Sequence, residues 1–292
     1  MQSDSLKFVA IHPNLYLRRL CFILICISAF PLTGLYAQKL VKKIPASAKQ
    51  ELTTSKKMRV DIWSDVMCPF CYIGKRRFEA ALASFNHKEN IEVVWHSFQL
   101  DPDSKPQPDK DVYTWLAERK GISLAQSKQM HERVVNMAKD AGLEYNFDKA
   151  VIANSFDAHR IAQYAKTQGK GDAIEEQLFR GYFTEGKDIS NHEVLTDMCV
   201  SIGLDAAAVK AILSGNDFAD AVHEDVNMAS QLRINGVPFF VLNNKYGVSG
   251  AQESATFAQA LNKAWEEYEQ EQPQITVLGD DSAACEPGGD CK

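Results

Sequence analysis

Two short stretches in the first half of the chain alternate between apolar and polar residues. Residues 58–62 (MRVDI) and 91–98 (IEVVWHSF) show this alternation, which is typical of β-strands with one buried face. Between them, apolar residues recur near the helical spacing from Phe70 to Phe85, which predicts a helix over about 69–85. The pattern therefore predicts a strand, a helix and a second strand, in that order.

The middle of the chain has the apolar spacing of helices. Residues 101–110 hold three prolines among charged residues, so the chain is expected to leave the sheet there. From about 111 to 215 the pattern predicts only helices. Ser-x-x-Gln at 123–126 and Ser-x-x-Glu at 190–193 predict capping boxes, and Asn154 is predicted to be the N-cap of another helix.

The last regular elements again include strands. Pro238 lies in an apolar run, and the turn sequence Asn243-Asn244-Lys245 follows it, which predicts a β-hairpin. The predicted elements are a helix at about 217–231, strands at 236–242 and 246–248, and a helix at about 253–270. The whole order predicts an α/β fold around a long helical middle.

The first residues have the pattern of a secretory signal peptide. Arg18-Arg19 precede an uncharged apolar run over residues 20–30, and small or helix-breaking residues lead to Ala37, which suits a cleavage site. We therefore expect residues 1–37 to be a signal peptide and the protein to be exported to the periplasm. An uncleaved membrane anchor is the lesser alternative, and only in that case is a membrane partner expected.

The residues on either side of the predicted fold are polar. Residues 38–57 are rich in lysine and have no apolar period, so they are expected to form a linker. Residues 271–292 are expected to form a flexible tail. Met58 stands where the first strand begins, and translation from Met58 would instead leave the protein in the cytoplasm.

Composition and charge narrow the possible functions. The chain has 292 residues, of which 45% are hydrophobic and 24% charged. These values are typical of a globular protein with a sizeable core, and they exclude collagen-like and wholly disordered chains. The net charge of −6 argues against a general nucleic-acid-binding protein.

The clearest chemical signal is a C-x-x-C motif. Cys68 and Cys71 stand where the predicted strand gives way to a helix, and Pro69 suits the first helical turn. A helix N-terminus favours the thiolate, and two intervening residues allow a disulfide to form. The motif therefore predicts redox chemistry. The alternatives are inert structural thiols, or half of a zinc site with Cys285 and Cys291 as a second pair at an unusual spacing.

Two further residues are interpreted as structural. Cys199 lies in an apolar helical segment and is expected to be buried core without a function. His96 is expected to be a residue of the strand face and not an acid–base group.

Five segments resemble the DsbA-like thioredoxin proteins of the FrnE type. They are residues 64–74 (SDVMCPFCYIG), 98–102 (FQLDP), 154–160 (NSFDAHR), 236–240 (GVPFF) and 248–252 (VSGAQ). Together they extend across about residues 58–270 in the right order. The resemblance implies a thioredoxin fold with a large all-helical insertion: a thioredoxin-like domain at 58–101 and 216–270, and the insertion at 102–215.

The resemblance also implies roles for individual residues. Cys68 would be the attacking thiol and Cys71 the resolving thiol. Val237 and Pro238 would be joined by a cis peptide bond and form part of the edge on which a substrate peptide docks. His159 lies in a segment that the resemblance places on the active-site face, although its position at the border of an apolar helix face favours a partly buried structural histidine.

The chain departs from the family pattern near its C-terminus. FrnE-type proteins often carry a second cysteine pair there with four residues between, whereas Cys285 and Cys291 have five between them. An auxiliary redox pair and a simple structural disulfide are both open interpretations. Most of these relatives are also cytosolic, whereas this chain is expected to be exported.

We expect a thiol–disulfide oxidoreductase that exchanges disulfides with protein thiols and disulfides and needs no metal or organic cofactor. The alternative is a glutathione-dependent isomerase or transferase of the 2-hydroxychromene-2-carboxylate isomerase type, from the same superfamily, with glutathione as a partner near Cys68. Those enzymes usually have serine at the position of Cys68 and lack the second thiol. The direction of electron flow is not predictable from Pro69 and Phe70 between the cysteines.

Overall fold

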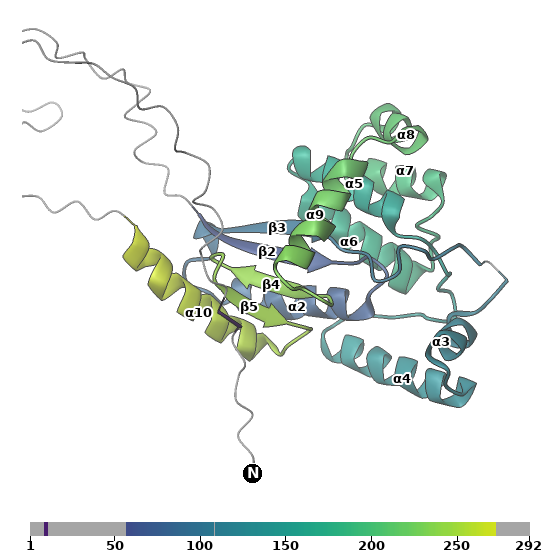
Figure 1. Ribbon diagram of the computed structural model, residues 1–292, viewed down its shortest axis with the longest axis horizontal. Helices are drawn as coiled ribbons and strands as arrows, with labels where there is room; N and C mark the ends of the chain where they lie inside the picture. The colour runs from purple at the N-terminus through teal and green to yellow at the C-terminus, as the bar shows by residue number, and fades with distance from the viewer. Residues whose placement is uncertain (1–8, 11–56, 108, 273–292) are drawn as a thin grey trace, which may run out of the picture.

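The computed structural model describes residues 9–10, 57–107 and 109–272. At its centre is a mixed sheet with the strand order β1-β5-β4-β2-β3 (Figure 1). β2 runs parallel to β3 and antiparallel to β4, and β4 and β5 form an antiparallel hairpin. The strands are β1 (Val9–Ala10), β2 (Met58–Ser64), β3 (Ile91–Ser97), β4 (Phe239–Leu242) and β5 (Tyr246–Ser249).

Helices cover both faces of this sheet (Figure 1). On one face, Phe78 of α2 (Pro69–Ala83) and Phe257 of α10 (Ser254–Glu271) contact Phe240 of β4. On the other face, α9 (Ala219–Gln231) packs against the sheet through Ala229, which shares a buried cluster with Trp63. The remaining helices are η1 (Lys88–Asn90), α3 (Val112–Lys120), α4 (Leu124–Asp140), α5 (Phe156–Thr167), α6 (Gly171–Arg180), the π-helical η2 (Gly181–Glu185), α7 (His192–Ser201) and α8 (Ala206–Ser214).

The predicted α/β class and the predicted order of elements are confirmed. The strand predicted at 236–242 begins only at Phe239, because Pro238 has no N–H to give to a strand ladder. Asn243 and Asn244 have φ values of 51° and 53°, which suit the tight hairpin turn that the sequence predicts.

One of the two predicted capping boxes forms. The Ser123 hydroxyl accepts a hydrogen bond from the N–H of Gln126 (3.2 Å), and the Gln126 side chain accepts one from the N–H of Ser123 (2.9 Å). The box predicted at 190–193 is wrong. Asn191 caps α7 instead, because the Ser190 hydroxyl accepts the N–H of Asn154 (2.8 Å) and is not available to the helix.

The N-cap predicted at Asn154 is wrong by one residue. The N-cap of α5 is Ser155, whose own side chain makes no capping hydrogen bond. The Asn154 side chain nevertheless accepts the N–H of Phe156 (2.9 Å), so it satisfies one of the unpaired donors at the start of the helix.

The described residues have two large apolar cores. One lies between the sheet, α2 and α10, and the other joins the first turns of α2 to the helices α4 to α8 through residues such as Tyr72, Ile73 and Phe179. The helices α3 to α8 all lie within 102–215. The division of the chain into a thioredoxin-like domain and an insertion stays a prediction.

Several predicted segments lie outside the described residues. They are the signal peptide except Val9–Ala10, the linker before Lys57, and the tail from residue 273, which carries Cys285 and Cys291. Within the ranges that are described, no helix combines the length and the apolar composition that a membrane span requires.

Candidate active site

Cys68 and Cys71 lie at the N-terminus of α2. Cys68 is the N-cap residue and Pro69 occupies the first helical turn, as the sequence predicts. The turn that leads into the helix is held by main-chain hydrogen bonds from Cys68 N–H to the Asp65 oxygen (2.9 Å) and from Cys71 N–H to the Cys68 oxygen (3.0 Å). Cys68 therefore lies at the positive end of the α2 dipole, although its side chain accepts no hydrogen bond from the first turn.

The Cys68 sulfur faces the segment that precedes β4. Its Sγ lies 3.5 Å from the carbonyl oxygen of Val237, and the peptide bond from Val237 to Pro238 is cis, as expected. Gly74 allows this approach, because a Cβ at this position would come within 2.9 Å of the Pro238 side chain. Gly74 belongs to the segment 64–74 but is not among the residues predicted from the sequence to form the site.

Both thiols are buried, and Cys68 is 3% exposed. Cys71 is 1% exposed, and burial together with the neighbouring Cys68 raises its pKa well above the usual value. The main-chain N–H of Asp65 and the hydroxyl of Ser64 act in the opposite direction but do not cancel this rise in pKa. Cys71 therefore stays a protonated thiol beside Cys68 and can donate a hydrogen bond to it.

A large cavity opens beside the motif. Its volume is about 790 Å³, and it lies between the active-site turn and the helical pair α3–α4. The lining is mainly apolar, with three basic side chains, Arg119, Lys120 and Arg133. The lining residues of the cavity include Met67, Cys68, Phe70, Leu100, Val112, Trp115, Leu116, Met130, Val134, Met137, Phe147, Ile152 and Phe183.

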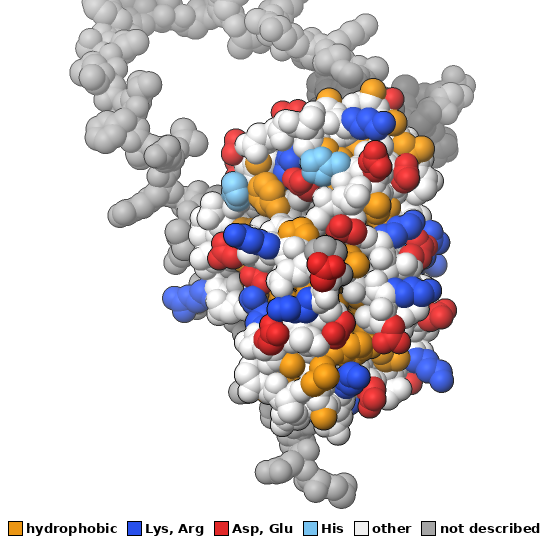
Figure 2. Space-filling view, turned by 90° about the vertical axis from the view of Figure 1, so that its right-hand side faces the viewer, with side chains coloured by type: hydrophobic (Ala, Val, Ile, Leu, Met, Phe, Trp, Pro, Cys, Tyr) orange, Lys and Arg blue, Asp and Glu red, His pale blue; other side chains and the backbone are white. Residues whose placement is uncertain are grey.

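The surface around this part of the molecule is mixed in character. Figure 2 shows acidic, basic and apolar side chains interspersed over the face that lies at the right of Figure 1. Close to the motif, Phe70 is 39% exposed and Leu100 is 49% exposed. Exposed large apolar side chains at a reactive thiol can contact the apolar side chains of a bound protein.

His159 is buried more deeply than the sequence predicts. It is 1% exposed, and its Nε2 lies 3.5 Å from Oδ1 of Asp65, in the loop between β2 and the motif. The interpretation as a partly buried residue is therefore wrong. A helix-face pattern does not show that α5 packs directly behind the active-site loop.

His96 is not a simple residue of the strand face. Its two ring nitrogens lie 2.6 Å from Asp61 and 2.6 Å from Asp225, and its ring stacks on Trp63. The sequence interpretation missed this buried group because Asp225 is 129 residues away in the chain. The interpretation of Cys199 as buried core is confirmed.

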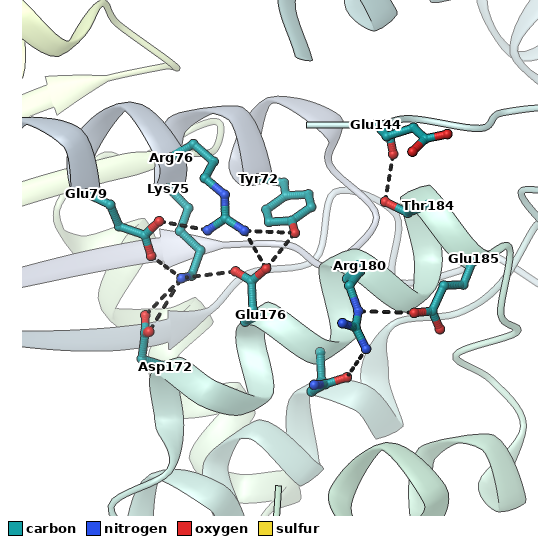
Figure 3. A network of polar contacts seen from close by, with 11 residues as sticks. Tyr72, Lys75, Arg76, Glu79, Glu144, Asp172, Glu176, Arg180, Thr184 and Glu185 are labelled. Carbon is teal, nitrogen blue, oxygen red and sulfur yellow. Dashed lines mark hydrogen bonds and ion pairs between the residues drawn. The ribbon is translucent and has the colours of Figure 1, made fainter. Parts of the chain in front are cut away.

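A polar network joins α2 to α6 directly behind the motif (Figure 3). The Tyr72 hydroxyl donates to Glu176 (2.6 Å), and Arg76 also pairs with Glu176. Lys75, whose side chain is 2% exposed, pairs with Glu79, Asp172 and Glu176 (Figure 3). Tyr72 follows Cys71 in the chain, so this network fixes the first turns of the active-site helix against the helices beside it.

Two interpretations from the sequence concern a zinc site and the role of the second cysteine pair. Among the described residues, no group of three or more His, Cys, Asp or Glu side chains is arranged to hold a metal ion. The second cysteine pair, Cys285 and Cys291, lies outside the described residues, so its role stays a prediction.

Known proteins share this arrangement of elements. A family model described as a DSBA-like thioredoxin domain matches residues 59–262. The crystal structure of a probable DsbA oxidoreductase, SCO1869 of Streptomyces coelicolor, is 40% identical, with a TM-score of 0.69; the match covers 80% of this chain and 97% of that one. The uncharacterized Bacillus subtilis protein YwbO is 26% identical over 212 residues, which are 70% of this chain and 96% of YwbO.

A more distant structure shares the fold alone. The 2-hydroxychromene-2-carboxylate isomerase structure is 15% identical with a TM-score of 0.54, and the match covers 74% of this chain and 100% of that one.

Proposed function

Because the chain belongs to the DSBA-like thioredoxin domain family, we propose that it is a protein-disulfide oxidoreductase that acts through Cys68 and Cys71. The thioredoxin fold implied by the sequence is shown by this membership, and the family supports a thiol oxidoreductase in general. The observation that carries the finer proposal is the placement of Cys68 at a helix N-terminus, 3.5 Å from the Val237 carbonyl oxygen.

The reaction needs only sulfur chemistry. A substrate thiolate attacks the Cys68 sulfur of the Cys68–Cys71 disulfide, and Cys71 leaves as a thiolate. A second substrate thiolate then attacks the substrate sulfur of the mixed disulfide, and Cys68 leaves as a thiolate. The substrate loses two electrons as its disulfide forms, and the enzyme gains them as a dithiol.

The surroundings of the two sulfurs suit these two roles. The raised pKa of Cys71 means that it takes up a proton soon after it leaves, which removes the nucleophile that would reverse the first step. Cys68 leaves at a helix N-terminus, which stabilises its negative charge. The same steps in reverse reduce or rearrange a substrate disulfide.

The docking edge supports a protein as the substrate. The main chain at Val237 lies beside Cys68, where it can offer polar groups to an extended peptide. Phe70 and Leu100 provide exposed apolar surface next to it. We propose protein thiols and disulfides as the partners.

Two serine variants test the proposal. Cys68→Ser should abolish disulfide exchange with a reduced, unfolded protein, because the attacked sulfur is lost. Reduced Cys71→Ser, mixed with a protein that carries disulfides, should accumulate mixed disulfides between Cys68 and that protein, because the resolving thiol is lost; mass spectrometry of the trapped product detects them. Full exchange activity in Cys68→Ser would overturn the assignment.

One observation favours a second candidate, a glutathione-dependent isomerase or transferase. The apolar cavity beside Cys68 is also lined by Lys120 and Arg133, two basic side chains that suit a small aromatic carboxylate. A third basic lining residue, Arg119, already pairs with Asp101 (2.6 Å). In this reading, glutathione would bind near Cys68 and Cys71 would be dispensable. Unchanged activity of Cys71→Ser toward a small aromatic substrate would therefore favour the second candidate.

We also propose that the chain is exported, on the basis of Arg18-Arg19 and the apolar run at 20–30. Cell fractionation, together with mass spectrometry of the mature N-terminus, tests this proposal. A protein that starts near residue 38 in the periplasm is the expected result, and a cytoplasmic protein that starts at Met58 would contradict it.

A further inference from the structure

Behind the turn that carries Cys68 lies a buried group of three titratable side chains. Asp65 comes from the loop after β2, His159 from α5 and Glu175 from α6. These residues are 2%, 1% and 4% exposed, respectively. An ionised side chain in such a place is unfavourable unless a partner compensates its charge. The contacts of the three groups therefore decide which of them is charged.

Only Asp65 is fully hydrogen-bonded. Its carboxylate accepts the N–H groups of Met67 (3.1 Å) and Leu100 (2.8 Å). Neither ring nitrogen of His159, nor Oε2 of Glu175, has a hydrogen-bond partner within the described part of the chain. The shortest ionic contact in the group is the 3.5 Å between His159 Nε2 and Asp65 Oδ1. His159 therefore acts on Asp65 across a contact at the outer limit of hydrogen-bond distance, where its charge matters more than a well-formed hydrogen bond.

The pKa directions agree with this placement. Burial alone would raise the pKa of Asp65, but His159 and the two N–H groups bring it below its usual value. Burial alone would lower the pKa of His159, but Asp65, followed by Glu175 and Asp225, raises it. The Asp65 anion and the His159 cation thus stabilise each other. Burial raises the pKa of Glu175 to about 7.

Other charged groups face this group from the neighbouring elements. Asp225 of α9 acts on His159, while Asp172 of α6 and Lys75 of α2 act on Glu175. Lys75 is itself held by three carboxylates (Figure 3). Burial and the charge of Asp65 raise the pKa of Tyr182, which therefore stays neutral. The cation in direct contact with Asp65 is His159.

Asp65 contacts both cysteines of the motif through main-chain atoms. Its main-chain oxygen accepts the N–H of Cys68 (2.9 Å), and its main-chain N–H interacts with the Cys71 sulfur. Its carboxylate holds Met67, the residue before Cys68. A change in the charge of Asp65 therefore acts on the geometry and the electrostatics of the motif together.

We propose that His159 is a positioning residue for Cys68: as a buried cation it keeps Asp65 ionised and compensates its charge within the active-site turn. This inference rests on the proposed function, in which Cys68 is the nucleophile. Without the cation, an ionised Asp65 would disfavour the Cys68 thiolate by repulsion. A protonated Asp65 would instead accept weaker hydrogen bonds from the N–H groups of Met67 and Leu100, and the turn would be held less firmly. Both outcomes make Cys68 less reactive.

Glu175 extends toward alkaline pH the range over which His159 stays protonated. Its carboxyl loses a proton near neutral pH, and the resulting negative charge keeps His159 protonated. The pH range over which Cys68 stays reactive is therefore set by His159 and Glu175, neither of which is part of the C-x-x-C motif.

The test is the rate of alkylation of Cys68 by iodoacetamide as a function of pH, measured in the full chain with Cys71→Ser as the common background. His159→Gln should move the midpoint of the profile upward by about one pH unit, which makes alkylation about tenfold slower below the midpoint. In an Asp65→Asn background the same substitution should have little further effect, because the two residues act as a pair. His192→Gln is the matched control, since His192 pairs with Asp157 on the surface and should leave the profile unchanged.

Glu175→Gln provides a second test if His159→Gln does not fold. It should give a smaller upward shift of the midpoint, and no change well below pH 7, where wild-type Glu175 is itself protonated. Coincident profiles for wild type, His159→Gln and Glu175→Gln would overturn the proposal. An undiminished His159→Gln effect in the Asp65→Asn background would also overturn it. Failure of the wild-type protein to exchange disulfides at all would instead overturn the proposed function.

Discussion

The sulfur of Cys68 lies 3.5 Å from the carbonyl oxygen of Val237, although 169 residues of chain separate the two. This contact joins the first turn of α2 to the cis-proline segment that leads into β4. The Cys68 thiol and the half-buried main chain at Val237 are thereby held side by side. A bound polypeptide could pair with that backbone and present a cysteine to Cys68.

Gly74 is predicted to be essential for this contact. Gly74→Ala would place a Cβ 2.9 Å from the Pro238 side chain, so α2 and the proline segment would have to move apart. We expect a loss of about 1–3 kcal/mol in the free energy of unfolding, and slower disulfide exchange. Urea unfolding and an exchange assay check both effects. Gly171→Ala is the control, because its Cβ would make only an ordinary contact at 3.6 Å and both measured values should stay near wild type.

The buried His96 should make the stability of the protein depend on pH. Burial alone would lower the pKa of His96, but Asp225 and Asp61 raise it above the usual value. Because the folded-state pKa exceeds that of the unfolded chain, the stabilisation is fully present below about pH 6.5. It is lost as the pH rises through the folded-state pKa. The free energy of unfolding, measured by urea from about pH 6 to about pH 9, should therefore fall.

Replacement of His96 provides the matched comparison. His96→Gln removes the cation between Asp61 and Asp225. Arg59 still pairs with Asp61, so we expect a loss of about 1–3 kcal/mol at the acidic end of the range. The variant should also show a flatter dependence of stability on pH. A variant whose pH dependence equals that of the wild type would contradict the account of His96.

Lys75 should contribute to stability less than its burial suggests. Lys75→Met removes the cation shared by Glu79, Asp172 and Glu176, but these acidic side chains are 37%, 64% and 29% exposed and water can hydrate them (Figure 3). We therefore expect a loss of about 1–2 kcal/mol rather than the full cost of an isolated buried charge. Urea unfolding measures it. An unchanged free energy of unfolding in Lys75→Met would mean that the network does not fix α2 to α6.

The cavity beside Cys68 should affect protein substrates more than small ones. Val134→Trp on α4 would fill part of the cavity without altering the motif. Loss of a site for one apolar side chain should lower kcat/KM for a reduced protein about tenfold. Exchange with oxidised glutathione should change far less. Gln129→Trp, on the exposed side of the same helix, controls for the added bulk, and equal losses with both substrates would contradict the role of the cavity.

Local chemistry made much of the site predictable from the sequence. Cys68 and Cys71 lie between strand and helix as expected, because a C-x-x-C motif followed by an apolar helical pattern is a local signal. The cis bond at Pro238 was implied by the family resemblance and is confirmed. The hairpin after β4 also follows from local residues, since two asparagines adopt positive φ readily.

The features that sequence reasoning missed depend on tertiary contacts. Asp65 contacts His159, and His96 contacts Asp225, only when α5 and α9 have packed in the folded protein. The capping box at 190–193 failed for a similar reason, because Ser190 hydrogen-bonds a residue from another part of the chain. A buried charged group is invisible in a periodicity pattern, which treats histidine and aspartate simply as polar.

The redox equilibrium of Cys68 and Cys71 decides whether the protein is a thiol–disulfide oxidoreductase. The full-length protein and the chain from residue 38 would be equilibrated with glutathione buffers, and mass spectrometry would measure the fraction that carries a Cys68–Cys71 disulfide. We predict a reversible two-electron transition that disappears in Cys68→Ser. A potential near about −120 mV would indicate a donor of disulfides and one near about −270 mV a reductase. Absence of a Cys68–Cys71 disulfide at every ratio of oxidised to reduced glutathione would contradict the account.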